Sequence, residues 1–324
     1  MPGFHRPLRG ATLLATALLA VGPAGCGSST SNDTSHTGTH GGGTHRPVTT
    51  SDADWTSVTD ALGRTGKFGD SNTVYRIPLV RSDLQVVTVG VSIKPGLSLG
   101  GYVAFAKYDD ATMVMGDLVV TEAELPKVTD ALQSHGIEQT ALHKHLLEQS
   151  PQVWWTHIHA MGDPAKLAAG VKAALDATAI APAAAPPAQQ PPVDLDTVGI
   201  DAALGRKGNP DGGLYKFNLA RQDTIVDDGH LVPPTFGVTT TVNFQPLGEG
   251  KAAINGDIVM TGPEVQKVIQ AVRAGNISLV MLHNHSLTDE PRRFYLQYWA
   301  VDDAVTLAKA MWAALDATNL QPAK

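Results

Sequence analysis

The sequence predicts an α+β fold of two tandem homologous domains, each a mainly antiparallel sheet with helices packed on one side. The main observation is an internal repeat with an offset of 140 residues. Three segments recur with no insertion or deletion between them: GDLVVT at 116–121 as GDIVMT at 256–261, LHKH at 142–145 as LHNH at 282–285, and AALDAT at 173–178 and 313–318. Within each copy, runs rich in β-branched and aromatic residues alternate with segments of helical spacing.

The elements of the first copy follow in order along the chain. A short helix is expected to end at Leu62, just before Gly63. Strands rich in β-branched and aromatic residues are expected next, at 74–80, 85–93, 102–108 and 111–120. The copy is completed by two further strands and an alanine-rich helix, at 138–147, 152–160 and 164–177.

A helix at about 122–134 is predicted from its first turn. Thr121 and Glu124 have the spacing of a capping box, in which each side chain accepts from the backbone amide of the other residue. Val128 and Leu132 follow at helical spacing. The second copy repeats the box with Thr261 and Glu264, so a helix is expected there too.

The composition along the chain indicates five segments. They are a lipoprotein signal peptide at 1–26, a disordered tether at 27–50, repeat domain 1 at 51–180, a linker rich in proline and alanine at 181–194, and repeat domain 2 at 195–320. The tether contains His36, His40 and His45, which are either polar filler or weak metal ligands.

The N-terminus has the features of a lipoprotein signal. Arg6 and Arg9 precede an uncharged stretch at 11–21, which is too short to span a bilayer but suits the apolar core of a secretory signal. Small residues and then Cys26 follow, an arrangement that resembles a bacterial lipobox. Cys26 is the only cysteine, so no internal disulfide can form. We expect a lipid anchor at Cys26 on the outer face of the cell membrane, with a plain signal peptide as the alternative.

The overall composition is that of a globular protein with no affinity for nucleic acid. Residues of hydrophobic type make up 43% and charged residues 17%, and the net charge is −7 with no basic block. Nucleic acid is therefore excluded as a partner. No stretch after the signal is long and apolar enough to cross a membrane.

Histidines in the first copy form the candidate metal site. His143 and His145 lie two apart on an expected strand and so point to one face, as do His157 and His159 on the next strand. With a turn centred near position 151, His145 would oppose His157 and His143 would oppose His159. Imidazoles bind divalent transition metals, with zinc among the candidates. Glu148 is placed to be a further ligand or a general base.

The second copy keeps only part of this set. His283 and His285 remain, and Glu290 follows within the acidic pair 289–290. The two later histidines are replaced by poor metal ligands, Gln297 and Trp299. We therefore expect one better-formed site in copy one and a degenerate or differently used one in copy two, with ordinary packing of the histidines as the alternative.

Further motifs resemble those of the LppY/LpqO-type family of mycobacterial and other actinobacterial lipoproteins, a tandem domain of unknown function. The motifs are PTFGV at 234–238, VNFQP at 242–246, GDIVMT at 256–261, LHNH at 282–285, EPR at 290–292 and WA-x-DD at 299–303. The resemblance covers about 51–320 and implies an envelope lipoprotein of this architecture, without implying a reaction. Weaker likenesses are to the cupin metal motif and to the zinc triad of acetolactate decarboxylase, also a tandem of two α+β halves.

Three functions follow from these observations. The first is a membrane-anchored envelope module that binds a divalent metal or a small polar ligand. The second is a metal-dependent hydrolase or lyase that uses His143, His145 and His157, with Glu148 as the catalytic residue. The third is a structural or interaction lipoprotein without a metal. No nucleophile elbow, Walker loop or His-Glu-x-x-His motif is present. The oligomeric state is left open.

Overall fold

A computed structural model describes residues 43–182 and 189–323. The expected signal peptide, Cys26 and most of the expected tether lie outside the described residues. Both repeats belong to one compact unit, Gly42–Lys324. Among the described helices, none combines the length and the apolar character needed to cross a membrane.

The first repeat forms a six-stranded sheet with strand order β1-β2-β5-β6-β8-β7, in which all neighbours are antiparallel. Its strands are β1 (Lys67–Gly69), β2 (Val74–Val80), β5 (Gly100–Lys107), β6 (Thr112–Thr121), β7 (Glu138–His143) and β8 (Val153–Gly162). Its helical segments are η1 (Asp52–Trp55), α1 (Thr56–Leu62), α2 (Pro95–Ser98), α3 (Leu125–Ser134) and α4 (Pro164–Asp176).

The second repeat forms the same sheet, β15-β17-β14-β13-β10-β9. Its strands are β9 (Asn209–Asp211), β10 (Leu214–Leu219), β13 (Thr240–Gly248), β14 (Lys251–Thr261), β15 (Ser278–His283) and β17 (Arg293–Asp303). Its helices are α5 (Thr197–Leu204), α6 (Gly262–Ala274) and α7 (Ala304–Asp316). A small sheet is added by β11 (Val226–Asp227), β12 (His230–Leu231) and β16 (Asp289–Glu290).

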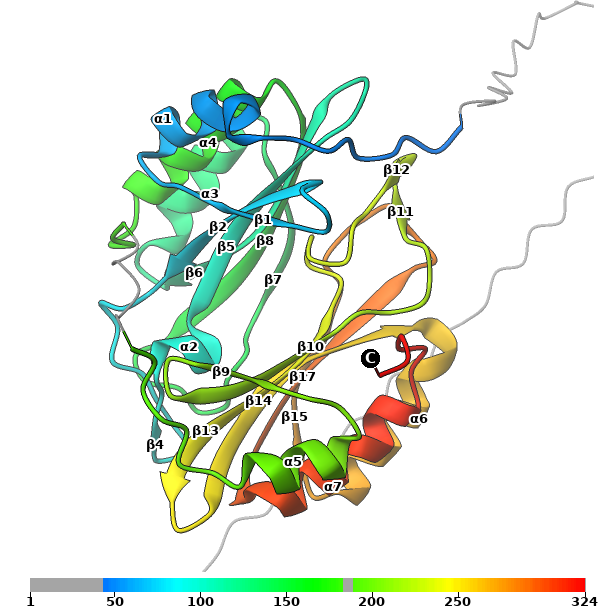
Figure 1. The fold of residues 1–324 in the computed structure, drawn as a ribbon. Helices are drawn as coiled ribbons and strands as arrows, with labels where there is room; N and C mark the ends of the chain where they lie inside the picture. Colours follow the sequence, from blue (N-terminus) through cyan, green and yellow to red (C-terminus); the bar gives the residue numbers. More distant parts are fainter. Residues whose placement is uncertain (1–42, 183–188, 324) are drawn as a thin grey trace, which may run out of the picture. The chain divides into compact units, whose positions relative to one another are not determined.

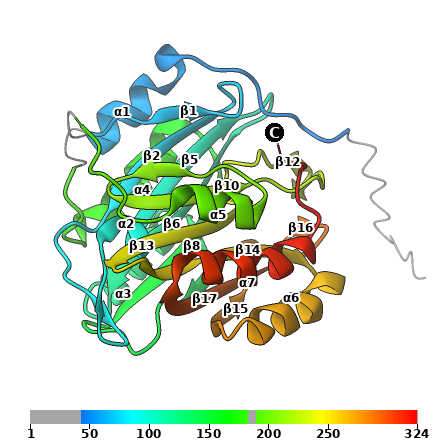
Figure 2. The ribbon, with the colours of Figure 1, turned by 60° about the horizontal axis from the view of Figure 1, so that its bottom comes forward.

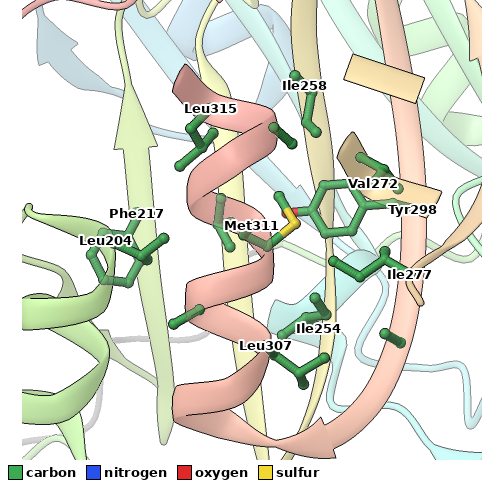
Figure 3. Packing of buried hydrophobic residues seen from close by; sticks show 14 of the residues in the cluster. Leu204, Phe217, Ile254, Ile258, Val272, Ile277, Tyr298, Leu307, Met311 and Leu315 are labelled. Atoms are coloured by element: carbon green, nitrogen blue, oxygen red, sulfur yellow. The ribbon is translucent and has the colours of Figure 1, made fainter. Parts of the chain in front are cut away.

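Each sheet carries its longer helices on one face, as the sequence predicts, whereas the short α2 packs between the repeats against β13 and β14 (Figure 1). In the second repeat, α7 buries Leu307, Met311 and Leu315 against Ile254 and Tyr298 of the sheet (Figure 3). The first repeat buries the equivalent face of its sheet under α1, α3 and α4. The predicted α+β fold of two tandem homologous domains is confirmed.

The opposite faces of the two sheets are also buried, because each is covered by the other repeat (Figures 1 and 2). Met113 and Met115 of β6 pack against Phe236 and Val238 of the second repeat. Trp155 of β8 shares an apolar cluster with Trp299 of β17. Strand β6 is therefore buried on both faces over Thr112–Val120. Antiparallel sheets commonly leave one face to solvent, and this sheet does not do so at β6.

In each repeat a buried arginine forms ion pairs with the glutamate of the capping box and with a nearby aspartate. The Arg81 guanidinium donates to Glu124 (2.7 Å) and to Asp83 (2.9 Å), and Glu124 also closes the predicted box with Thr121. In the second repeat Arg221 makes the same contacts with Glu264 and Asp223. The glutamate of each box is thus held by a buried cation, and the backbone after the last helix also donates to it.

Two local expectations differ from the structure. The single strand expected at 85–93 is a small hairpin of β3 (Val87–Thr88) and β4 (Val91–Ser92), because Val89 and Gly90 take positive φ and turn the chain. The described end of the expected tether, 43–50, is bonded to both repeats: Val48 and Thr50 donate backbone hydrogen bonds to the first repeat, and His45 bonds to the second. The His45 amide donates to the Gly229 carbonyl, and the Leu231 amide donates to the His45 carbonyl, both at 2.9 Å.

Candidate metal centre between the repeats

The two His-x-His segments meet at one place, where the edge strands of the two sheets lie together. Strand β7 ends at His143 and strand β15 ends at His283. The Thr140 hydroxyl donates to the His285 carbonyl (2.6 Å), and the Asn284 side chain donates to the Thr140 carbonyl (3.0 Å). These bonds hold the two repeats together directly beside the histidines.

Four histidines, two from each repeat, form a compact cluster. One ring nitrogen from each lies within 4.8 Å of the others in the set His143, His157, His283 and His285. His143 and His283 occupy equivalent positions and stack with ring centroids 3.8 Å apart, while His157 stacks on His285 at 3.5 Å. Because equivalent residues touch each other, an approximate two-fold axis relates the repeats at this point.

His145 and two aspartates extend the cluster. Asp117 Oδ2 lies 3.6 Å from Nε2 of both His145 and His157, and Asp257 Oδ2 lies 3.4 Å from His285 Nε2. Asp117, His143 and His145 form a second set of potential ligands in which each donor atom is within 4.8 Å of the others. The site therefore offers five imidazoles and two carboxylates from both halves of the chain.

The repeated Gly-Asp motif explains how the aspartates reach the centre. A Cβ added to Gly116 would lie 2.6 Å from the Tyr102 carbonyl oxygen, and one added to Gly256 would overlap the Thr241 carbonyl. Glycine is needed because the neighbouring strand passes so close. The next residue on each strand then points to the opposite face, which is the face between the repeats.

Burial keeps the histidines neutral. Desolvation lowers the pKa of His143, His145, His157 and His285 well below its usual range, and the charge that a neighbouring histidine would carry acts in the same direction. Desolvation also lowers the pKa of His283, against the pull of the nearby carboxylate. Neutral imidazole is the form that binds a metal ion.

Burial acts in the opposite direction on the two aspartates. Desolvation raises the pKa of Asp117 well above its usual range, and the charge of Asp257 raises it further. Desolvation raises the pKa of Asp257 to about 6. Two buried carboxylates without a cation between them are costly, and a divalent ion would stabilise both in the ionised form.

The nitrogen positions suit a transition-metal ion. The Nε2 atoms are 2.8 Å apart in the pair His143–His145 and 3.1 Å apart in His283–His285. A tetrahedral ion with metal–nitrogen bonds of about 2.0–2.1 Å holds its nitrogens about 3.3 Å apart, and opposite ligands of a six-coordinate ion are about 4.2 Å apart. Small side-chain movements would bring the nitrogens of these pairs to the separations that such an ion requires.

Buried nitrogens without hydrogen-bond partners, and a ring whose orientation is set by its neighbours, also favour a metal site. Within the described part of the chain, His143 Nδ1, His157 Nε2 and His283 Nδ1 are buried without a hydrogen-bond partner. His285 Nδ1 lies 3.2 Å from the Gly237 carbonyl, an acceptor that places the ring proton on Nδ1 and leaves Nε2 free as a ligand. The same ring stacks on Tyr295, so its orientation is set before any ion binds.

A cavity of about 730 Å³ opens beside the cluster. Both repeats line it, and the side chains that bring chemistry to it are Asp117, His145, His157, Asp257, His285 and Gln297. A smaller hollow of about 210 Å³ lies beside Arg221 and Gln321, away from the histidines. The larger cavity is the one that gives a ligand access to the candidate metal centre.

The structure brings together five of the sequence-predicted metal ligands and leaves out the others. His159 lies further along β8, where Nδ1 is 4.0 Å from Glu138. Glu148 is exposed in the loop after β7, and Glu290 is exposed on β16, where it pairs with Val226; neither belongs to a cluster of potential ligands among the described residues. Glu148 is thus not placed for the catalytic role expected of it.

The register of the histidine hairpin differs from the expected one. His143 pairs with Trp155 and His157 pairs with Ala141, so the loop between the strands is centred at Gln149 instead of position 151. A bulge between Gln139 and Ala141 then shifts the pairing farther from the loop by one more residue. The same bulge recurs between Leu279 and Met281. The sequence led us to expect a better-formed site in copy one and a degenerate or differently used one in copy two. The structure instead brings the two His-x-His pairs together in one cluster.

Sequence reasoning missed three residues of this site. Asp117 and Asp257 stand in the repeated Gly-Asp motif, and that exact recurrence was the available signal. Arg76 also lines the cavity, and its only signal is that the second repeat has a basic residue, Lys216, at the equivalent position 140 residues later.

Fold and site together define a class of protein: a tandemly duplicated α+β protein with a histidine-rich centre between its repeats. The chain belongs to the family described as Domain of Unknown Function (DUF1259), whose model matches it twice, over residues 56–177 and 198–317. No curated protein matches the chain.

Two solved structures have a weak similarity to the chain. They are a trimeric bacterial microcompartment shell protein, PduB, and EtuB from Clostridium kluyveri. Each is 10% identical, with 78% of this chain and 90% of the other covered, and the TM-scores are 0.21 and 0.19. At these TM-scores the similarity carries no inference about fold or function.

Proposed function

We propose that this protein binds one divalent transition-metal ion, with zinc the first candidate, at a centre shared by its two repeats. The observation that carries the proposal is the cluster of His143, His157, His283 and His285, in which ligand atoms from both repeats lie within 4.8 Å of one another. Each repeat supplies only half of this set, so the duplication itself builds the site.

The chemistry of the donors supports the proposal. The imidazoles are buried and neutral, and several of their nitrogens have no other partner in the described chain. Unpaired buried polar atoms are costly in a core, and an ion that coordinates them removes that cost. Imidazole with carboxylate nearby is a donor set typical of zinc and similar ions.

We further propose that the mature protein is an envelope lipoprotein of the LppY/LpqO type, held on the outer face of the cell membrane. Its support is the charged and then apolar N-terminus that leads to a lipobox-like Cys26. Metabolic labelling with a palmitate analogue tests this, because replacing Cys26 with serine should abolish the label and release the protein from membranes.

Metal binding is tested directly on the purified chain. It should be stripped with a chelator, reloaded separately with Zn(II), Co(II) and Ni(II), and analysed for bound metal after desalting. We expect one ion per chain. A metal content at background for all three ions would refute the proposal and leave the histidines with a packing role only.

A metal-dependent hydrolase or lyase is the second candidate, and the cavity of about 730 Å³ is the observation that favours it. A pure storage or structural site has no need of a cavity this large. Because Glu148 is remote, Asp117 and Asp257 are the carboxylates placed for proton transfer. Turnover of esters, lactones or 2-oxo acids that is lost on chelation and restored by metal would separate an enzyme from a binder.

A further inference from the structure

The cavity beside the candidate metal centre has a cationic side chain with no acidic partner. We propose that it binds a small organic oxyanion, a carboxylate or a phosphate ester, whose charged group is held by the Arg76 guanidinium. This inference rests on the proposed metal site and names the class of ligand that the site receives.

Arg76 is fixed in place without an ion pair, although its charge acts on Asp117 and partly opposes the rise in the pKa of that carboxyl. It lies on β2, Nη1 donates to the Thr235 carbonyl (2.9 Å), and the guanidinium lies over the Tyr102 ring at 3.2 Å from its centroid. Among the described residues it forms no ion pair, whereas the buried arginines Arg81 and Arg221 each hold two carboxylates. A guanidinium with free donors is a ready site for an oxyanion.

The equivalent position in the second repeat is occupied differently. Lys216 pairs with Asp211 (2.7 Å), so its charge is compensated. The third lysine or arginine of the cavity, Lys94, donates to the Gly213 carbonyl at 3.2 Å. The cavity is thus asymmetric: Lys216 is paired with an acid, whereas Arg76 and Lys94 form no ion pair among the described residues, and Arg76 alone offers the planar fork that suits an oxyanion.

A second observation points independently to a ligand. Gln297 is 1% exposed, lines the cavity, and has no hydrogen-bond partner within the described chain at either Oε1 or Nε2. It stands where the first repeat has His157. A buried amide that lacks both partners is a costly arrangement, which a bound polar molecule would relieve.

The charge balance indicates an anion once the metal is bound. The charged residues that line the cavity are three cations, Arg76, Lys94 and Lys216, and three acids, Asp117, Asp211 and Asp257. They cancel when all are ionised, so a divalent ion leaves two excess positive charges. An anion of one or two charges restores neutrality, and a volume of about 730 Å³ is in the range of sites for small organic molecules rather than for a single inorganic ion.

The test uses the chain loaded with Co(II), with its metal content measured first. Benzoate and phenyl phosphate serve as the two oxyanion probes, and benzamide serves as the neutral molecule of the same shape. Binding is followed by calorimetry and by the visible absorption of Co(II). We expect at least one oxyanion to bind about 10-fold or more tightly than benzamide, since a hydrogen bond to a charged group contributes roughly this much.

Two variants assign the effect to Arg76. Arg76→Gln should keep one ion per chain and lose about 10- to 100-fold in oxyanion affinity, while the matched Lys216→Gln change in the other repeat should lose less than about 3-fold. If Arg76→Gln does not fold, Arg76→Lys should show an intermediate loss, since it keeps the charge without the planar fork.

The outcomes separate this inference from the metal proposal. A metal-loaded chain that binds neither oxyanion, binds benzamide equally well, or binds oxyanions unchanged in both Arg76 variants overturns the inference and leaves the metal site standing. A chain that binds no metal overturns the proposed function, and the inference falls with it. Preference for one probe decides between carboxylate and phosphate.

Discussion

Replacing His283 with alanine should weaken metal binding as strongly as replacing His143 with alanine, although the two residues belong to different repeats. Both rings lie in the four-histidine cluster and stack on each other at 3.8 Å. If each repeat held its own ion, His283→Ala would leave the first site untouched. The two arrangements therefore predict opposite results for a single substitution.

The expected size of the effect follows from the number of ligands. Structural zinc sites with four protein ligands have apparent binding free energies of about 10–16 kcal/mol. One ligand of four then carries roughly 3–4 kcal/mol, which corresponds to a dissociation constant about 10²- to 10³-fold larger. The double variant should lose less than the sum of the two single losses, because both rings act on the same ion.

Competition against a chromophoric chelator measures the affinity, and elemental analysis gives the number of ions per chain. Thermal unfolding of each variant checks that the fold survives. His159→Ala and Glu290→Gln are the controls, since both residues lie outside the cluster, and neither should change the affinity by more than about 2-fold. The shared-site model fails if the parent binds two ions and each histidine variant loses one of them.

Three further predictions concern the fold around the site. Gly116→Ala should lower the free energy of unfolding by about 1–3 kcal/mol in chemical denaturation, because the added methyl group would lie 2.6 Å from the Tyr102 carbonyl oxygen. Gly256→Ala should destabilise the protein at least as much. Wild-type stability in either variant would contradict the packing described. Arg81→Met should lower the free energy of unfolding by about 2–4 kcal/mol, because it removes a buried guanidinium and leaves its two carboxylates without a cation. Lys172→Met, which breaks an exposed pair, should change the unfolding midpoint little. Equal effects of the two substitutions would contradict a stabilising role of the buried network. The hydrogen bond that His45 Nδ1 donates to Asp109 raises the pKa of His45 above 6.5, despite a smaller opposing effect of desolvation. The stabilisation of residues 43–50 by this bond should therefore be complete below pH 6.5 and be lost as the pH rises through the folded-state pKa. Amide exchange at Leu231, measured in parallel on His45→Gln at each pH, tests this, and an identical pH response in the variant would exclude it.

Much of the fold follows from local patterns in the sequence. The offset of 140 residues, the capping boxes at Thr121 and Thr261 and the β-branched runs predict two α+β copies with helices in the observed places. The hairpin register could not be predicted, because it depends on where the loop after His143 is centred, and the structure centres it at Gln149 instead of position 151. Such a shift changes which side chains oppose each other across the strands.

The sequence singled out the five histidines of the cluster, but it did not predict that the two repeats bring them together. The spacing of two in each His-x-His pair determines that both rings of a pair point to one side of the chain. The spacing does not reveal which part of the chain packs against that side. Asp117 and Asp257 were likewise visible only as a repeated motif, since the role of a carboxylate depends on the neighbours that burial gives it.

The sequence by itself determined that there are two copies, that each is an α+β unit, and that each presents a histidine pair from the strand after its capped helix. Only the tertiary structure shows that the two histidine pairs come together in one cluster instead of lying apart. The physical reason is that each sheet has a second apolar face, which is buried by the other repeat in shared clusters such as the one that contains Trp155 and Trp299. That packing brings edge strands β7 and β15 together and places His143 on His283.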